Sequence, residues 1–186
     1  MADVLVCWIG NTDLKAAVGD PAAGLGPIGR AVAARPFDAV HLLSDYPDSR
    51  SAPYAVWLRT QTSAPVRVRA EPLSGPTRFG EIYEAAVRGV TEALEAAGPG
   101  ARLAFHLSPG TPAMAAVWIL LAKTRFPAEL IESSPQEGVV TASVPFDLSA
   151  DFLPDLLRRP DRELERLSQG LPPEAPEFAD ILHRSP

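Results

Sequence analysis

The sequence of 186 residues contains one cysteine, three histidines and no apolar run of the roughly 20 residues that span a membrane. Because Cys7 has no partner in the chain, an intrachain disulfide and a cysteine-built metal site are excluded, and a reducing compartment fits. The histidines are too dispersed for a recognisable metal motif: His41, His106 and His183. Met1 is followed by an apolar run without the basic start of a signal peptide, so we expect a cytoplasmic protein with no membrane association.

The chain also lacks an excess of positive charge and the common catalytic signatures. Its 17 basic and 23 acidic residues give a formal net charge of -6, which argues against a broad basic face for duplex DNA. No P-loop, nucleophile elbow or helix-spaced carboxylate pair is present, so we predict no catalytic residues, no metal and no resident cofactor. A small anionic ligand is compatible with this charge, since one local pocket can be positive.

The sequence does contain an alternation of short apolar runs and amphipathic segments. Strands are expected at residues 4–9, 39–43, 66–70, 103–107, 129–132 and 139–144, and helices at residues 27–34, 54–62, 80–97 and 112–124. Strands that are apolar throughout are typical of a parallel sheet covered on both faces. We therefore predict an α/β, Rossmann-like domain over residues 1–147, with a mostly parallel sheet, helices on both faces and a C-terminal β-hairpin.

Beyond Phe146 the sequence becomes richer in charge. Residues 148–169 are expected to form a small annex of two short helices. The prolines within residues 170–176 indicate a stiff linker, because proline favours an extended backbone and cannot continue a helix.

Polar or turn-forming residues follow each of the first four expected strands. These segments are residues 10–13, 44–46, 74–79 and 108–111. In a parallel α/β sheet, ligands bind outside the carboxyl ends of the strands, near the point where the strand order reverses. The last segment also precedes a helix, whose first N–H groups lack internal partners and attract anions. The alternative interpretation is that these residues only turn the chain and cap helices.

Residues 24–29 match the dinucleotide-binding pattern G-x-G-x-x-G, but fourteen residues separate the first strand from Gly24. The functional fingerprint begins directly after the strand, and we interpret Pro27 as the first-turn proline of a helix. Asp45 follows the second strand, where the acidic ribose partner of such a site would stand, so a nicotinamide-dinucleotide-binding enzyme stays an alternative. His106 lies inside an apolar strand and is interpreted as a hydrogen-bonded core histidine.

Three segments resemble the CARF domain family, and the closest likeness is to the N-terminal sensor domain of RtcR-type sigma-54-dependent transcriptional activators. The segments are residues 8–14, 42–46 and 108–114. Gly110, Thr111 and Met114 match the glycine- and threonine-containing turn of the family. Residues 108–109 replace its usual threonine-glycine pair, and Pro112 stands where a basic residue is often found.

The resemblance implies a Rossmann-like homodimer that binds a cyclic oligoadenylate or another RNA-derived nucleotide across its dyad. The match assigns five residues to the ligand: Asn11, Thr12, Ser108, Gly110 and Thr111. With the other strand-end positions, the candidate ligand-binding residues are Gly10, Asn11, Thr12, Ser44, Asp45, Arg78, Phe79, Ser108, Pro109, Gly110, Thr111 and Met114. A ring nuclease that cleaves its own cyclic ligand is the enzymatic alternative, although no general base is evident.

Residues 177–186 resemble the opening of the AAA+ ATPase module of sigma-54 activators, and residues 170–186 are assigned to the linker and the start of that module. The resemblance implies a sensor whose AAA+ and DNA-binding domains lie beyond Pro186. We expect ligand binding to control the attached ATPase in transcription regulation, in RNA repair or a CRISPR-type response. An ordinary polar C-terminus is the alternative interpretation of these residues.

Overall fold

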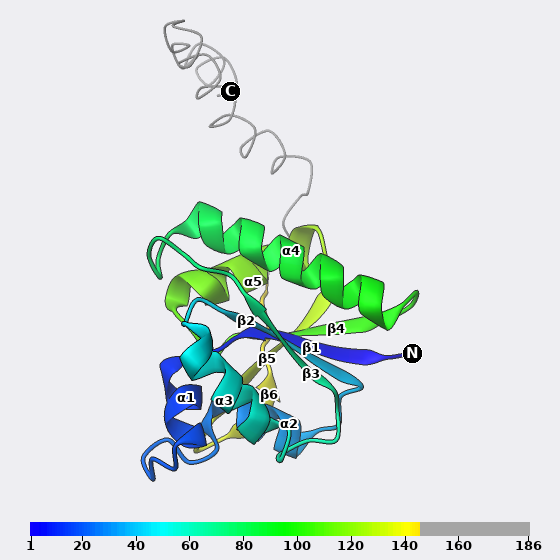
Figure 1. The fold of residues 1–186 in the computed structure, drawn as a ribbon. Coiled ribbons are helices and arrows are strands. Elements are labelled where there is room, and N and C mark those ends of the chain that lie inside the picture. Colours follow the sequence, from blue (N-terminus) through cyan, green and yellow to red (C-terminus); the bar gives the residue numbers. More distant parts are fainter. Residues whose placement is uncertain (146–186) are drawn as a thin grey trace, which may run out of the picture. The chain divides into compact units, whose positions relative to one another are not determined.

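A six-stranded sheet forms the centre of the computed structural model, which describes residues 1–145 (Figure 1). Its strands are β1 (Asp3–Trp8), β2 (Ala39–Ser44), β3 (Val66–Ala70), β4 (Arg102–His106), β5 (Ala128–Ser134) and β6 (Gly138–Thr141). The order across the sheet is β3-β2-β1-β4-β5-β6, with β1 to β5 parallel and β6 antiparallel to β5. The predicted Rossmann-like α/β sheet and its closing hairpin are confirmed.

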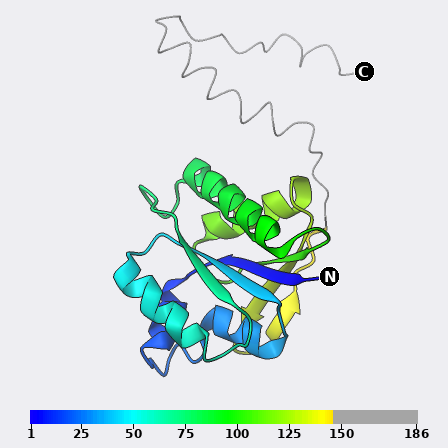
Figure 2. The same ribbon diagram turned by 45° about the vertical axis from the view of Figure 1, so that its right-hand side comes forward.

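Helices cover both faces of this sheet (Figures 1 and 2). Those formed by residues 1–145 are α1 (Asn11–Ala17), α2 (Gly26–Ala34), α3 (Asp48–Leu58), α4 (Phe79–Ala97) and α5 (Pro112–Thr124). Successive strand side chains point to opposite faces. Even-numbered residues from Val4 to Trp8 therefore pack with α4 and α5, and odd-numbered residues from Leu5 to Ile9 pack with α1, α2 and α3.

The structure differs from the sequence-based expectation at two helices. Residues 10–13 were expected as a loop, but α1 begins at Asn11 with Gly10 as its N-cap. Helix α3 begins at Asp48 rather than at Tyr54, and so it runs through Pro53. An internal proline removes one backbone hydrogen bond, but the neighbouring Tyr54 is buried in the core cluster that includes residues of β1 and β2.

The expected helical annex at residues 148–169 and the expected linker at residues 170–186 lie outside the described residues. None of the helices formed by residues 1–145 has the length and apolar character that crossing a bilayer requires.

Candidate functional site

The strand order reverses between β1 and β4, the two central strands of the sheet. They pair in parallel, with Val6 opposite Phe105, so their carboxyl ends open at the same edge. The turn after β1 begins at Gly10, and the turn after β4 comprises residues 108–111. This edge is where ligands bind in sheets of this type.

The two turns touch through their backbones. A Cβ atom added to Gly10 would lie 2.8 Å from the backbone nitrogen of Gly110 and 3.4 Å from the Cα atom of Pro109. Gly110 itself has a φ of +89°, and a Cβ atom there would lie 2.7 Å from the Sδ atom of Met114. Glycine is therefore required on both sides of the contact, and a ligand over the reversal point meets both turns.

Asp13 fixes the first turn from the interior of the protein. Its side chain is fully buried, and its carboxylate accepts hydrogen bonds from the backbone N–H groups of Gly10 at 3.0 Å and Ile28 at 2.9 Å. It thereby joins the start of α1 to the start of α2. Burial raises the pKa of Asp13 to about 6, although the backbone hydrogen bonds act in the opposite direction.

The hydroxyl of Thr111 connects the turn after β4 to the loop before α4. Thr111 is the N-cap of α5, and its Oγ1 accepts a hydrogen bond from the backbone N–H of Met114 at 3.3 Å. The same hydroxyl donates to the carbonyl oxygen of Pro76 at 2.9 Å. This bond brings the segment that carries Arg78 to the candidate edge.

Ser108 and His106 are connected through Ser133 on β5. The Oγ of Ser108 accepts a hydrogen bond from the backbone N–H of Ser133 at 2.7 Å, and the Nε2 of His106 lies 3.0 Å from the Oγ of Ser133. His106 is fully buried, and burial lowers its pKa to about 3. It is the hydrogen-bonded core histidine that the sequence predicted, and its neutral ring is too weak a base to activate a hydroxyl near neutral pH.

The predicted site residues fall into an exposed group and a buried group. The exposed or half-exposed residues at this edge are Asn11, Thr12, Asp45, Arg78, Phe79, Ser108, Gly110 and Thr111, and the buried ones are Gly10, Ser44, Pro109 and Met114. Ser44 is only 2% exposed, and its Oγ accepts from the N–H of Tyr46 at 3.2 Å, which closes the turn after β2. The buried residues shape the turns and do not present side chains to a ligand.

Arg50 is a cation at this edge that sequence analysis did not identify. It lies in the first turn of α3, and its guanidinium lies 4.8 Å from the centroid of the Tyr46 ring. Its Nη2 atom donates to the Oδ1 of Asn11 at 3.4 Å. The expected start of this helix at Tyr54 had placed Arg50 in an unassigned segment, so no signal drew attention to it.

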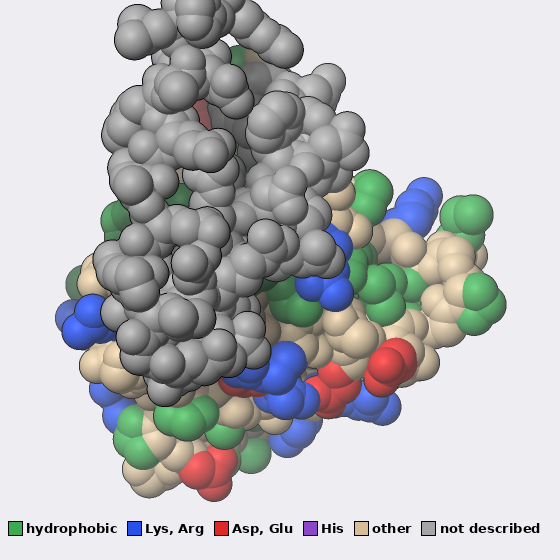
Figure 3. Space-filling model, turned by 90° about the horizontal axis from the view of Figure 1, so that it is seen from above, with side chains coloured by type: hydrophobic (Ala, Val, Ile, Leu, Met, Phe, Trp, Pro, Cys, Tyr) green, Lys and Arg blue, Asp and Glu red, His purple; other side chains and the backbone are tan. Residues whose placement is uncertain are grey.

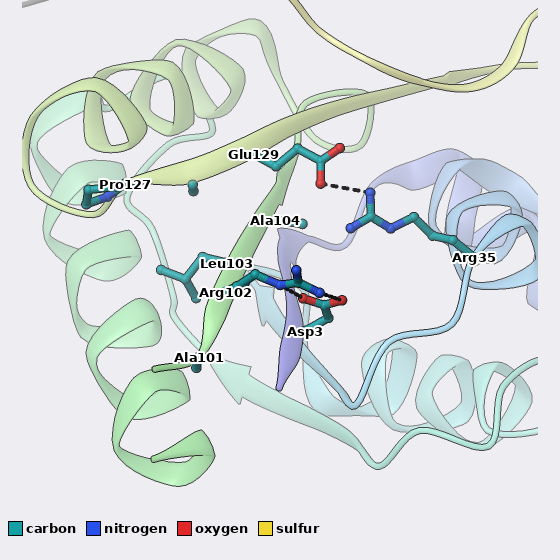
Figure 4. A pocket seen from close by; sticks show the side chains of 9 residues that line it. Asp3, Arg35, Ala101, Arg102, Leu103, Ala104, Pro127 and Glu129 are labelled. Carbon is teal, nitrogen blue, oxygen red and sulfur yellow. Dashed lines mark hydrogen bonds and ion pairs between the residues drawn. The ribbon is translucent and has the colours of Figure 1, made fainter. Parts of the chain in front are cut away.

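A hollow of about 500 Å³ opens at the opposite edge, around the amino ends of β1, β4 and β5 (Figure 4). Its charged side chains neutralise each other. Arg102 donates two hydrogen bonds of 2.6 Å to Asp3, and Arg35 donates to Glu129 at 2.8 Å. Because these charges are paired and the strands end at the other edge, we assign the candidate site to the turns after β1 and β4.

One face of the described residues shows how their charged side chains are distributed. On the face in Figure 3, outside the part drawn in grey, basic and acidic side chains are interspersed and no extended basic surface is visible. Within residues 1–145 no three side chains that could hold a metal ion gather together.

No protein-family model and no curated protein sequence matches the chain. Several solved structures do match its fold. Csm6 of Enterococcus italicus, bound to cyclic hexa-2'-fluoro-hexa-dAMP, has a TM-score of 0.56 and 16% identity over 89% of this chain. A type III CRISPR defence DNA nuclease activated by cyclic oligoadenylate has a TM-score of 0.52 and 19% identity over 76% of this chain.

The chain therefore shares the fold of these two structures. A third match, protein VC1899 from Vibrio cholerae, has a TM-score of 0.55 and 12% identity over 78% of this chain. The chain spans 39%, 20% and 34% of the three matched chains, in the order given. At these identities the likeness concerns the fold, and at that level the resemblance found in the sequence is confirmed.

Proposed function

We propose that this CARF-like domain senses a cyclic oligoadenylate, or a related RNA-derived nucleotide, at the edge formed by the turns after β1 and β4. One observation carries the proposal. The backbones of Gly10 and Gly110 meet at the reversal of strand order, which is where sheets of this type bind ligands. Two structures with the same fold support the proposal. The Csm6 structure is bound to cyclic hexa-2'-fluoro-hexa-dAMP, and the CRISPR defence nuclease is activated by cyclic oligoadenylate.

The exposed groups at this edge suit a phosphodiester with ribose hydroxyls. Asn11 and Thr12 stand at the start of α1 and present an amide and a hydroxyl to solvent. The Oγ of Ser108 accepts from Ser133, and a hydroxyl that accepts one bond still has its proton to donate to a phosphate oxygen. The start of α5 adds positive potential, since the first N–H groups of a helix lack internal partners.

The ligand is proposed to act on a homodimer, in which two copies of this edge contact one nucleotide. A sensor works through different affinities for two dimer arrangements. The resemblance of residues 177–186 to the opening of an AAA+ module supports a sigma-54 activator ATPase as the controlled partner. Transcription regulation in RNA repair or in a CRISPR-type response is the corresponding biological setting.

The enzymatic alternatives have less support. His106 and Asp13 are both fully buried, and neither can reach a ribose hydroxyl as a general base. The nicotinamide alternative requires free N–H groups at the start of α2 for a pyrophosphate. There the carboxylate of Asp13 accepts from Ile28, and Pro27 has no N–H to donate.

Calorimetric titration of the full chain with cyclic tetra-adenylate, cyclic hexa-adenylate and RNA ending in a 2',3'-cyclic phosphate tests the proposal. Binding of any one supports it, and binding of none refutes it. Sedimentation of the same samples measures the oligomeric state and so tests the homodimer. A protein that is monomeric at saturating ligand would contradict it.

Gly10→Ala connects binding to the contact between the two turns. The added Cβ atom would lie 2.8 Å from the nitrogen of Gly110, so the turns must separate, and we expect affinity to fall by at least about tenfold. Gly80→Ala is the matched control, since a Cβ atom there meets nothing within 4 Å. If the two variants bind the ligand with equal affinity, the contact between the two turns is not part of the ligand site.

A further inference from the structure

We infer that Arg50, held between Tyr46 and Asn11, binds a phosphate of the ligand and supplies the cation that the turn after β4 lacks. This inference rests on the proposed function and names the residue that recognises the charge of the ligand. It is argued from the position of Arg50, from the donors that its contacts leave free, and from the lack of a basic residue in the turn after β4.

The first argument is position. Helix α3 starts directly after the turn that follows β2, and β2 pairs in parallel with β1. Arg50 is therefore carried to the same edge as Gly10. The hydrogen bond of 3.4 Å from its Nη2 to the Oδ1 of Asn11 joins the first turns of α3 and α1. A ligand that contacts Asn11 consequently lies within reach of the guanidinium.

The second argument is the set of free donors. The guanidinium lies over the Tyr46 ring at 4.8 Å, and Tyr46 is held by its backbone bond to Ser44 at 3.2 Å. Of the five N–H donors of the guanidinium, the hydrogen bonds found among the described residues use one, which goes to Asn11. A planar fork with free donors matches two oxygens of a phosphate.

The third argument is charge. Four arginines of residues 1–145 form ion pairs with carboxylates, namely Arg35, Arg69, Arg88 and Arg102. Arg50 forms none with the described carboxylates, although Asp48 lies in the same first turn of α3. The turn after β4, residues 107–112, contains no basic residue. An anion at this edge therefore depends on cations that come from other elements.

The test measures the affinity of the full chain for cyclic tetra-adenylate, cyclic hexa-adenylate and RNA ending in a 2',3'-cyclic phosphate. It compares wild type with Arg50→Ala, Arg50→Lys and Arg125→Ala. Arg125 is exposed at the C-terminal end of α5, so its replacement removes the same charge away from the candidate edge. We expect Arg50→Ala to weaken binding by about 10- to 100-fold, the size of a charge-assisted pair of hydrogen bonds. Arg125→Ala should bind like wild type.

Arg50→Lys keeps the charge but loses the planar fork, so its affinity should lie between those of wild type and Arg50→Ala. The weakening by Arg50→Ala should shrink as salt is raised, because it is electrostatic. If wild type binds and Arg50→Ala matches Arg125→Ala, this inference fails while the proposed function stands. If wild type binds none of the nucleotides, both fail.

Discussion

Replacing Asp13 by asparagine should destabilise the protein more at acidic pH than at neutral pH. The carboxyl has an ordinary pKa of 3.8 and, when the protein is folded, a pKa raised by burial to about 6. The folded protein thus binds this proton more tightly than the unfolded chain. The Asp13 carboxyl therefore contributes stability that is fully present below pH 3.8 and is lost as the pH rises through 6.

The magnitude follows from the same two pKa values. The difference between the two pKa values corresponds to a stabilisation of the folded state of about 3 kcal/mol when the carboxyl is protonated. About 2 kcal/mol of this stabilisation is lost between pH 4.5 and pH 7. Asparagine does not titrate and has one acceptor oxygen for the two N–H groups of Gly10 and Ile28. Wild type should be more stable than Asp13→Asn, and this difference in unfolding free energy should be larger at pH 4.5 than at pH 7 by about 2 kcal/mol.

Urea unfolding followed by tryptophan fluorescence measures this difference at both pH values. Other titrating groups, such as the buried His106, change the stability of both proteins equally and cancel in the comparison. Asp48→Asn is the control, because Asp48 is exposed and its replacement removes the same charge. A stability difference between Asp13→Asn and wild type that stays constant with pH would refute the assignment of a buried, desolvated carboxylate.

Two further predictions concern stability. Trp118→Ala should destabilise the protein by about 3–5 kcal/mol in urea unfolding, because the ring is fully buried and stacks on Phe105 at 4.7 Å; a loss below 1 kcal/mol would contradict this packing. Burial tends to raise the pKa of Glu71, but hydrogen bonds from Arg88 and Arg69 outweigh it and lower the pKa. Glu71→Gln should therefore cost about 1–3 kcal/mol at pH 7, and the difference from wild type should shrink as the pH falls below 4.5, where the unpaired carboxyl of the unfolded chain is protonated; an equal loss at pH 3 and pH 7 would contradict it.

The strands were predictable because their apolar runs end at turn residues. The expected strand at residues 4–9 agrees to within one residue at each end with β1 (Asp3–Trp8). Helix α1 was not predictable, because it has only seven residues and one of its buried side chains is the carboxylate of Asp13. Periodicity counts a carboxylate as solvent-facing. Its burial depends on the hydrogen bonds from Gly10 and from the distant Ile28, and the second of these is a tertiary contact.

The positions of the candidate turns were predictable from the ends of the expected strands, but the roles of their side chains were not. Thr111 bonds to Pro76 and Ser108 bonds to Ser133, and both partners are distant in the sequence. A hydroxyl can bind a ligand only if a distant part of the chain has not already taken its proton, and the sequence does not show which distant residues become its partners. Arg50 was missed for the related reason that Pro53 concealed the start of α3.

These contacts determine where recognition of an anion can reside at this edge. The Thr111 hydroxyl already accepts from Met114 and donates to Pro76, so it has no proton left for a phosphate. Pro112 at the start of α5 offers neither an N–H nor a charge. The turn after β4 therefore contributes shape, its Gly110 backbone and one free hydroxyl proton at Ser108. The charge recognition must come from the neighbouring elements. There Arg50 is joined to Asn11 and keeps its other donors free, and Arg78 is a second exposed cation.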